Sequence, residues 1–205
     1  EALKKSAEEA LKSEAHIRNV TFASFPWVSY ASLSALYPHE RDYLVMDAAG
    51  LATDITVVAQ GRIARVASCG AGVRALAKKS PHMGEEKLEG GIHIRRDTSE
   101  TKAAPEGKSA WLTSTVRALK DLSEHQALPR MLFLLADDTY ASDVKAMLTD
   151  ESVRSLWLSD DPLSIITVTP AQLQAAIVPM GEGTDDIFLM LAAYHAARAY
   201  TQGKG

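Results

Sequence analysis

The sequence holds little of what marks several common protein classes. Cys69 is its only cysteine, which excludes an internal disulfide framework and a cysteine-rich zinc site. The longest apolar runs, 131–136 and 187–193, are far shorter than the roughly 20 residues of a membrane-spanning helix. Lysine and arginine number 22 against 26 aspartates and glutamates, so the basic excess used to bind nucleic acid is missing. We expect no membrane span, no nucleic-acid partner and a reducing, cytoplasmic compartment.

The composition is that of an ordinary globular protein, with 46% hydrophobic and 23% charged residues. A length of 205 residues suits one moderate α/β domain or two small lobes. The chain starts within a predicted helix and without an initiator methionine, so we expect a fragment or one domain of a longer protein. We interpret 1–205 as a single lobe, in which 1–24 form a leading helix and strand.

Hydrophobic periodicity predicts helices alternating with strands. A proline-led helix after Pro26 is expected to bury Trp27, Tyr30 and their helical neighbours. Gln60-Gly61 predicts a tight turn between antiparallel strands. The predicted strands are 19–24, 43–47, 55–59, 62–67, 131–135 and 163–168. The other predicted helices are 2–15, 70–79, 109–124, 140–148 and one starting at Thr184, with Asp185 and Asp186 in its first turn.

The segment 84–107 is rich in turn formers and poor in large apolar side chains, which predicts an exposed loop. Ile92 and Ile94 alternate with polar residues in GGIHIRRD. Such a stretch would pair as a short edge strand with a partner protein or a second subunit. The alternative is a solvated linker that binds nothing.

The turn between the first two strands of the predicted meander is built from small residues. The octet DAAGLATD at 47–54 resembles the second phosphate-binding hairpin of the actin, sugar-kinase and heat-shock-chaperone ATPase superfamily, usually close to D-x-G-x-G-x-T-D. Ala49 and Leu51 stand where that pattern has glycines, which let backbone N–H groups approach phosphate. The other interpretation is an ordinary β-turn with an acid at a strand end. The residues that match the pattern are Asp47, Gly50, Thr53 and Asp54.

The order of segments around this octet resembles cell-division protein FtsA and pilus-assembly protein PilM. The resemblance implies that Asp47 orients a Mg²⁺-bound water, that Glu86 or its neighbour Glu85 lies near the ribose, and that the turn at Asp137 and Asp138 faces the purine and α-phosphate. Two carboxylates in that turn would repel a polyanion. The alternative is that Asp137 or Asp138 caps the following helix.

The fold that the resemblance implies is a ribonuclease-H-like, actin-type α/β lobe: a three-strand antiparallel meander extended by parallel strands and flanked by helices. The favoured function is a scaffold without catalytic residues or a cofactor. It would bind protein partners at the membrane, in cell division or type IV pilus assembly, or associate with itself. One alternative is a divergent homologue that binds Mg-ATP weakly together with a companion lobe. Another is a structural α/β protein of unrelated role.

Overall fold

The computed structural model describes residues 2–14, 20–76, 105–157, 161, 163–174, 176–177 and 186–202. Several predictions lie outside these residues: the end of the helix expected at 70–79, most of the loop expected at 84–107, and the cap expected at Thr184 and Asp185. Glu86, Ile92 and Ile94 also lie outside them. None of the helices among the described residues is both long and apolar enough to cross a bilayer.

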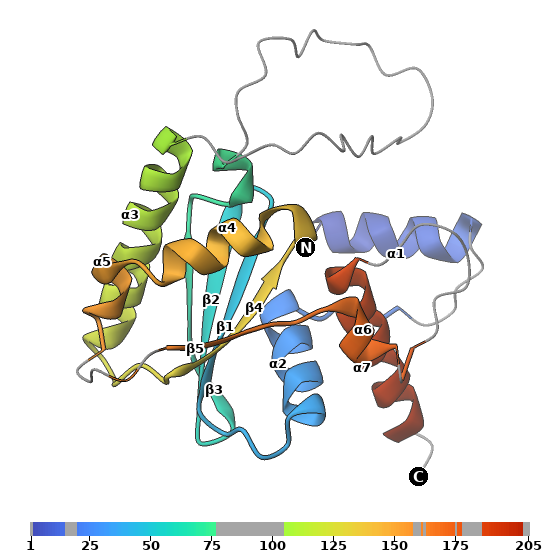
Figure 1. Cartoon of the computed structure of the whole chain (residues 1–205). Coiled ribbons are helices and arrows are strands. Elements are labelled where there is room, and N and C mark those ends of the chain that lie inside the picture. Colours follow the sequence, from blue (N-terminus) through green and yellow to red (C-terminus); the bar gives the residue numbers. More distant parts are fainter. Residues whose placement is uncertain are drawn as a thin grey trace, which may run out of the picture.

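The described strands form one sheet with the order β3-β2-β1-β4-β5 (Figure 1). β1 pairs with β2 and β2 with β3 antiparallel, while β4 adds parallel to β1 and β5 parallel to β4. This is the predicted meander with its parallel extension, and it confirms a ribonuclease-H-like, actin-type lobe. The strands are β1 (Tyr43–Ala49), β2 (Ala52–Ala59), β3 (Arg62–Cys69), β4 (Met131–Ala136) and β5 (Ser164–Thr167).

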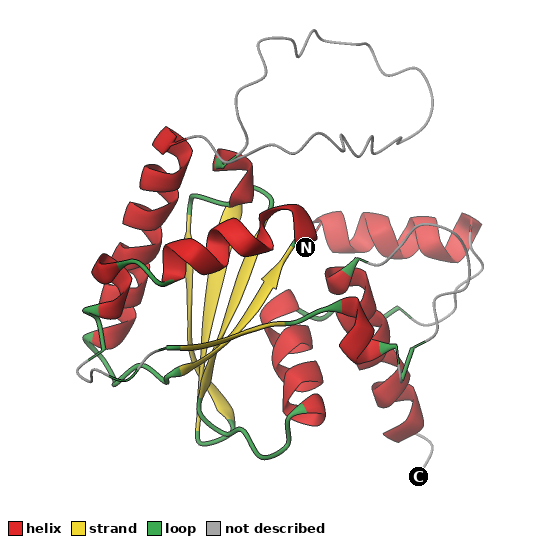
Figure 2. Ribbon diagram, in the orientation of Figure 1, coloured by secondary structure: helices red, strands yellow, loops and turns green. Residues whose placement is uncertain are grey.

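Helices flank the sheet (Figure 2). The longest, α3, begins at Pro105, so residues 105–107 belong to a helix and not to the expected loop. The helices are α1 (Ala2–Glu14), α2 (Phe25–Leu36), the 3-10 turn η1 (Val73–Ala75), α3 (Pro105–Ser123), α4 (Asp138–Leu148), α5 (Glu151–Arg154), α6 (Pro170–Leu173) and α7 (Ile187–Gln202).

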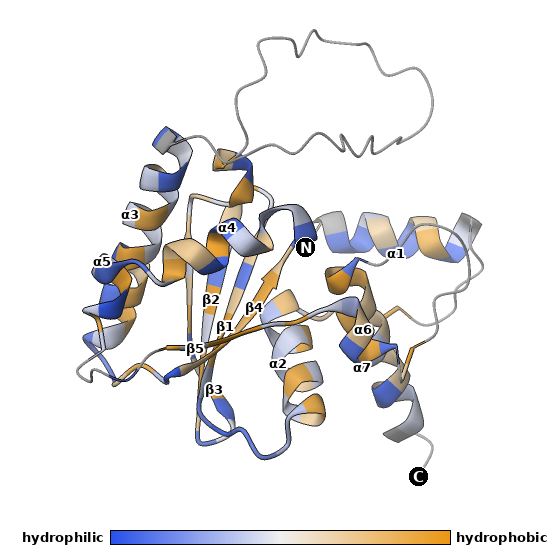
Figure 3. Cartoon of the chain, in the orientation of Figure 1, coloured by the Kyte–Doolittle hydropathy of each residue, from blue (hydrophilic) through white to orange (hydrophobic). Residues whose placement is uncertain are grey.

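Alternation along β1 gives each face of the sheet its own core. Leu44 and Met46 belong to a cluster with α3 and α4, called here the α3-side core. Tyr43 and Val45 point the other way, into the α2-side core with α2 and α7. β4 is buried on both faces, which explains its unbroken apolar sequence and its hydrophobic colour in Figure 3.

The turn between β2 and β3 has the geometry that its sequence predicts. Gln60 and Gly61 both have positive φ, 52° and 72°, as a two-residue turn of type I′ requires. Asp42 accepts a hydrogen bond from the backbone N–H of Gln60 at 2.8 Å. From α2, the Tyr30 hydroxyl donates to the carbonyl of Gly61 at 2.7 Å, which fixes the turn against that helix.

α2 buries a different face from the one predicted. Trp27 is 50% exposed, whereas small and aliphatic side chains, including Ser32 and Leu33, are buried. The reason is the close neighbour α7: the Ser32 hydroxyl donates to the carbonyl of Leu191 at 3.2 Å, a contact that a large side chain would prevent. The prediction that Trp27 is a core residue was wrong.

Three further predictions need correction. Residues 20–24 form no strand, because the alternation there is short and the segment pairs with no described strand. The helix expected at 70–79 is only the turn η1 within the described residues. Asp186 caps α7 from outside its first turn, accepting bonds from the N–H groups of Phe188 and Leu189.

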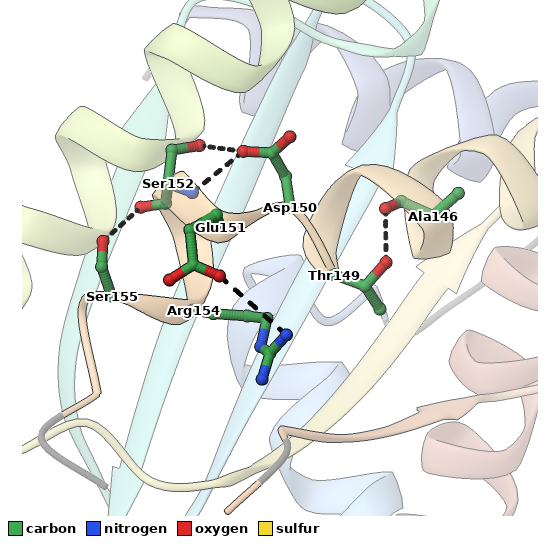
Figure 4. A network of polar contacts seen from close by, with 7 residues as sticks. All are labelled: Ala146, Thr149, Asp150, Glu151, Ser152, Arg154 and Ser155. Carbon is green, nitrogen blue, oxygen red and sulfur yellow. Dashed lines mark hydrogen bonds and ion pairs between the residues drawn. The ribbon is translucent and has the colours of Figure 1, made fainter. Parts of the chain in front are cut away.

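The connection between α4 and α5 is an exposed capping network (Figure 4). Asp150 accepts hydrogen bonds from the backbone N–H of Ser152 at 2.9 Å and from its hydroxyl at 2.6 Å. These bonds stabilise the carboxylate and lower the pKa of Asp150. Arg154 lies 4.0 Å from Glu151 one turn away, a solvated ion pair of small energetic value. The network serves the helix start and carries no sign of a binding site.

Candidate cation and phosphate site at the β1–β2 hairpin

Two carboxyl groups meet on one face of the sheet at the end of β1. Asp47 and Asp54 are register partners across the antiparallel β1–β2 pair. Directly opposed residues in such a pair have their Cβ atoms about 5 Å apart and point to the same face. Alternation along β1 places both on the face of Tyr43 and Val45, which is the α2 side. The hairpin therefore brings together the first and last residues of the matched octet.

The two carboxyl groups differ in their surroundings. One oxygen of Asp47, Oδ1, is buried and has no hydrogen-bond partner. Burial, and secondarily the charge of Asp54, raises the pKa of Asp47 to about 7. Near neutral pH both the protonated and the ionised form of this carboxyl group are therefore populated, and the ionised form lacks a compensating partner. A buried, unpartnered carboxylate oxygen is what a bound cation would satisfy.

Thr53 lies on the opposite face of the sheet, the α3 side, and is fully buried. Its hydroxyl donates to the carbonyl of Ala71 at 2.8 Å and accepts from the indole N–H of Trp111 at 3.0 Å. The Cys69 thiol contacts the carbonyl of Thr53 at 3.4 Å. The hydroxyl that the resemblance assigns to phosphate is thus engaged within the fold, and it does not lie with Asp47 and Asp54.

The hairpin turn is held from the outside by the loop after β3. Gly50 has a positive φ of 53°. Its carbonyl accepts a hydrogen bond from the backbone N–H of Arg74 at 3.0 Å. Gly72 lies so close that a Cβ there would stand 2.4 Å from that carbonyl and 2.6 Å from the nitrogen of Ala52. Leu51, at the tip, is 73% exposed, so its side chain extends into solvent.

Asp137 follows β4 at the same end of the sheet as the β1–β2 hairpin. It comes one residue after Ala136, which pairs with Ala48 of β1. Its carboxylate accepts a hydrogen bond from the backbone N–H of Thr139 at 2.9 Å and caps α4. The capping interpretation of this acid is therefore confirmed. A helix N-terminus can bind phosphate through its free N–H groups, but here the protein's own carboxylate uses one of them.

The described residues contain no group of three or more metal-ligating side chains. A pair of carboxylates still fits Mg²⁺, which keeps several waters and takes one or two carboxylates together with ligand phosphates. Asp47 and Asp54 form such a pair, as register partners on one face of the sheet. The roles of Trp111 and Gly72 were not predicted from the sequence. The only indications of these roles in the sequence were an aromatic side chain with a polar N–H group within a predicted helix and a glycine just after a predicted strand.

Comparisons with known proteins add the following. No protein-family model matches the sequence, and no curated protein does. A solved Ppx/GppA phosphatase of Aquifex aeolicus, a type II variant, resembles the chain with a TM-score of 0.42 and 12% identity, over 93% of this chain and 60% of that one. Another structure of the Aquifex aeolicus member of the Ppx/GppA family resembles the chain with a TM-score of 0.39 and 15% identity, over 93% of this chain and 59% of that one.

This chain spans about three fifths of the length of both Aquifex chains. At TM-scores below 0.5 the likeness is too distant to transfer a site or an activity. The assignment to a ribonuclease-H-like, actin-type lobe therefore depends on the strand order and strand directions of the sheet itself.

Proposed function

We propose that this chain is a divergent nucleotide-binding lobe of actin-like type, in which Asp47 and Asp54 take up a divalent cation. The observation that carries the proposal is the buried, unpartnered Oδ1 of Asp47 opposite a second carboxylate. Asp47 and Asp54 would hold this cation, which would supply positive charge that offsets the two carboxylates and attracts ligand phosphates. A companion lobe would provide the other wall of the ligand site.

The affinity of this lobe alone for Mg-ATP should be millimolar or weaker. Thr53 offers no free hydroxyl, and Asp137 and Asp138 place negative charge at the start of α4. Both features weaken contacts to a polyphosphate. We expect Leu51→Gly combined with Asp138→Gly to tighten Mg-ATP binding, because more backbone and less negative charge would face the ligand. Asp137 is left unchanged so that α4 keeps its cap.

Binding of Mn²⁺, a paramagnetic substitute for Mg²⁺, tests the cation site directly. At about pH 8 we expect Mn²⁺ to broaden the amide NMR signals of 46–55 selectively. Asp47→Asn and Asp54→Asn should each abolish this broadening. The control is Asp121→Asn, which removes an exposed carboxylate of α3 and should leave the broadening unchanged. Broadening that is spread over the whole surface, or unchanged in the Asp47 variant, would refute the site.

A second candidate is a scaffold of FtsA/PilM type, acting through protein partners at the membrane in cell division or pilus assembly. The capped start of α4 favours it, because a carboxylate occupies the helix N-terminus that would otherwise face phosphate. Calorimetry on the chain joined to its companion lobe separates the candidates. Micromolar Mg-ATP affinity supports the nucleotide-binding lobe, whereas no binding at millimolar ligand supports the scaffold.

A further inference from the structure

β3 is an edge of the sheet with an open outer side. It pairs with β2 only, and none of the other described strands lies against its far side. It runs for eight residues without proline. Every second backbone N–H and C=O of such an edge points outward and is available to an added strand. Edge β3 is therefore long enough to accept an extended peptide.

A bulge gives the two sides of this edge different chemistry. The register shifts between Val57 and Val58, so Ala64 is an extra residue in β3. As a result Arg62 and Arg65, opposite Ala59 and Val57, point to the same side of the sheet, the α3 side. Without the bulge, their odd spacing would place them on opposite sides.

Both arginines are exposed, and neither has a charged partner among the described residues. The α3 side of the edge therefore presents two uncompensated guanidinium groups. An arginine fork binds carboxylates through paired hydrogen bonds, so the chemistry that these two groups favour is acidic.

The α2 side of the same edge is apolar. Val66 is 50% exposed there, as the register partner of Thr56. Trp27 of α2 is also 50% exposed, and its ring packs on Tyr30 with 5.4 Å between centroids. Since Tyr30 is bonded to the turn that precedes β3, these aromatic rings lie on the side of the sheet where Val66 emerges.

We propose that β3 binds an extended segment of a partner protein in which acidic and apolar residues alternate. Side chains of an added strand point alternately to the two sides. Its acids would face Arg62 and Arg65, and its apolar residues would face Ile63 and Val66. A second copy of β3 fits poorly, because like charges on directly opposed residues repel. This inference does not depend on the cation site.

The probe is a labelled peptide of the length of β3 that alternates aspartate and valine. We expect saturable binding by fluorescence anisotropy, with amide NMR shifts concentrated in 62–69. A peptide of the same composition, with all aspartates before all valines, should bind at least about tenfold more weakly, a loss near 1.4 kcal/mol. A backbone N-methylated version should not bind.

The protein variant that tests the charges is Arg62→Glu with Arg65→Glu, both on exposed side chains. We expect it to lose at least about tenfold in affinity for the alternating aspartate–valine peptide, and to gain affinity for a peptide of the same length that alternates lysine and valine. The control is Lys145→Glu with Arg154→Glu on α4 and α5, which makes the same change of charge away from β3. The proposal would be overturned if the alternating peptide bound no more tightly than the peptide with all aspartates before all valines. Equal losses of affinity in the two protein variants, or no binding of the alternating peptide at all, would also overturn it.

Discussion

Trp111 and Thr53 are joined across the α3 side of the sheet by a buried hydrogen bond, with 3.0 Å between the indole Nε1 and the hydroxyl oxygen. The same hydroxyl donates to Ala71 in the loop after β3. One threonine thus connects α3, the start of β2 and the loop that holds the hairpin turn. Because both side chains are fully buried, neither polar group has water as an alternative partner.

Thr53→Val should destabilise the lobe by about 1–3 kcal/mol, because it leaves the indole N–H of Trp111 buried without an acceptor. Urea unfolding would measure the loss. A double-mutant cycle with Trp111→Phe should give a coupling energy of about 1 kcal/mol or more. Thr149→Val is the control, since the Thr149 hydroxyl bonds to Ala146 on the exposed surface. If Thr53→Val lost no more stability than Thr149→Val, this result would contradict the buried role of the Thr53 hydroxyl.

Gly72→Ala tests how tightly the loop after β3 holds the hairpin turn. A Cβ at this position would stand within 2.6 Å of three backbone atoms of the turn, so the turn or the loop must shift. We expect a loss of about 1–3 kcal/mol, the usual cost of forcing extra volume into a packed region. Gly70→Ala is the matched control, because a Cβ there meets nothing within 4 Å. The thermal midpoints of the two variants should differ clearly.

Much of the sheet follows from local pattern. A two-residue turn at Gly50-Leu51 pairs Ala49 with Ala52, and counting outward from it pairs Asp47 with Asp54. The carboxylate pair was therefore implicit in the octet. The apolar run of β4 likewise predicted a strand covered on both faces, because only such a strand can be apolar throughout.

Other features depend on contacts between distant parts of the chain. Thr53 and Trp111 lie 58 positions apart, and nothing local reveals which acceptor a buried indole will find. The exposure of Trp27 follows from α7 packing on the serine face of α2, which no periodicity within α2 indicates. Similarly, the two arginines of β3 share a side only because of a bulge that local sequence does not predict.

The segment 80–102 should be removable. The ends of the flanking described segments, η1 and α3, are in contact: a Cβ on Gly107 would overlap the carbonyl of Ala75. A short Gly-Ser linker can therefore replace the segment while preserving α3 from Pro105 onward. We expect the thermal midpoint to change little, because shortening a loop alters closure entropy by about 1 kcal/mol. Loss of cooperative unfolding would show that 80–102 contribute to the core.

Asp47 makes the stability of the lobe depend on pH. Its pKa is raised from 3.8 to about 7 in the folded state. Below about pH 4 the group is protonated in both states and has no effect. Between about pH 4 and pH 7 the unfolded chain releases this proton while the folded chain retains it, so stability falls as pH rises. Above about pH 7 the full penalty persists, up to about 4 kcal/mol for a shift of this size.

Asp47→Asn removes that ionisation. We expect the variant to be more stable than the wild type by about 2–4 kcal/mol at about pH 8, and to differ little from it at about pH 4. Denaturant unfolding at both pH values measures this. Asp54→Asn removes only the charge of Asp54, which is the smaller of the two causes that raise the pKa of Asp47. This variant should therefore show a smaller gain in stability. If Asp47→Asn instead destabilised the lobe equally at both pH values, the carboxyl group would have a partner in the folded state, and the cation site would lose its basis.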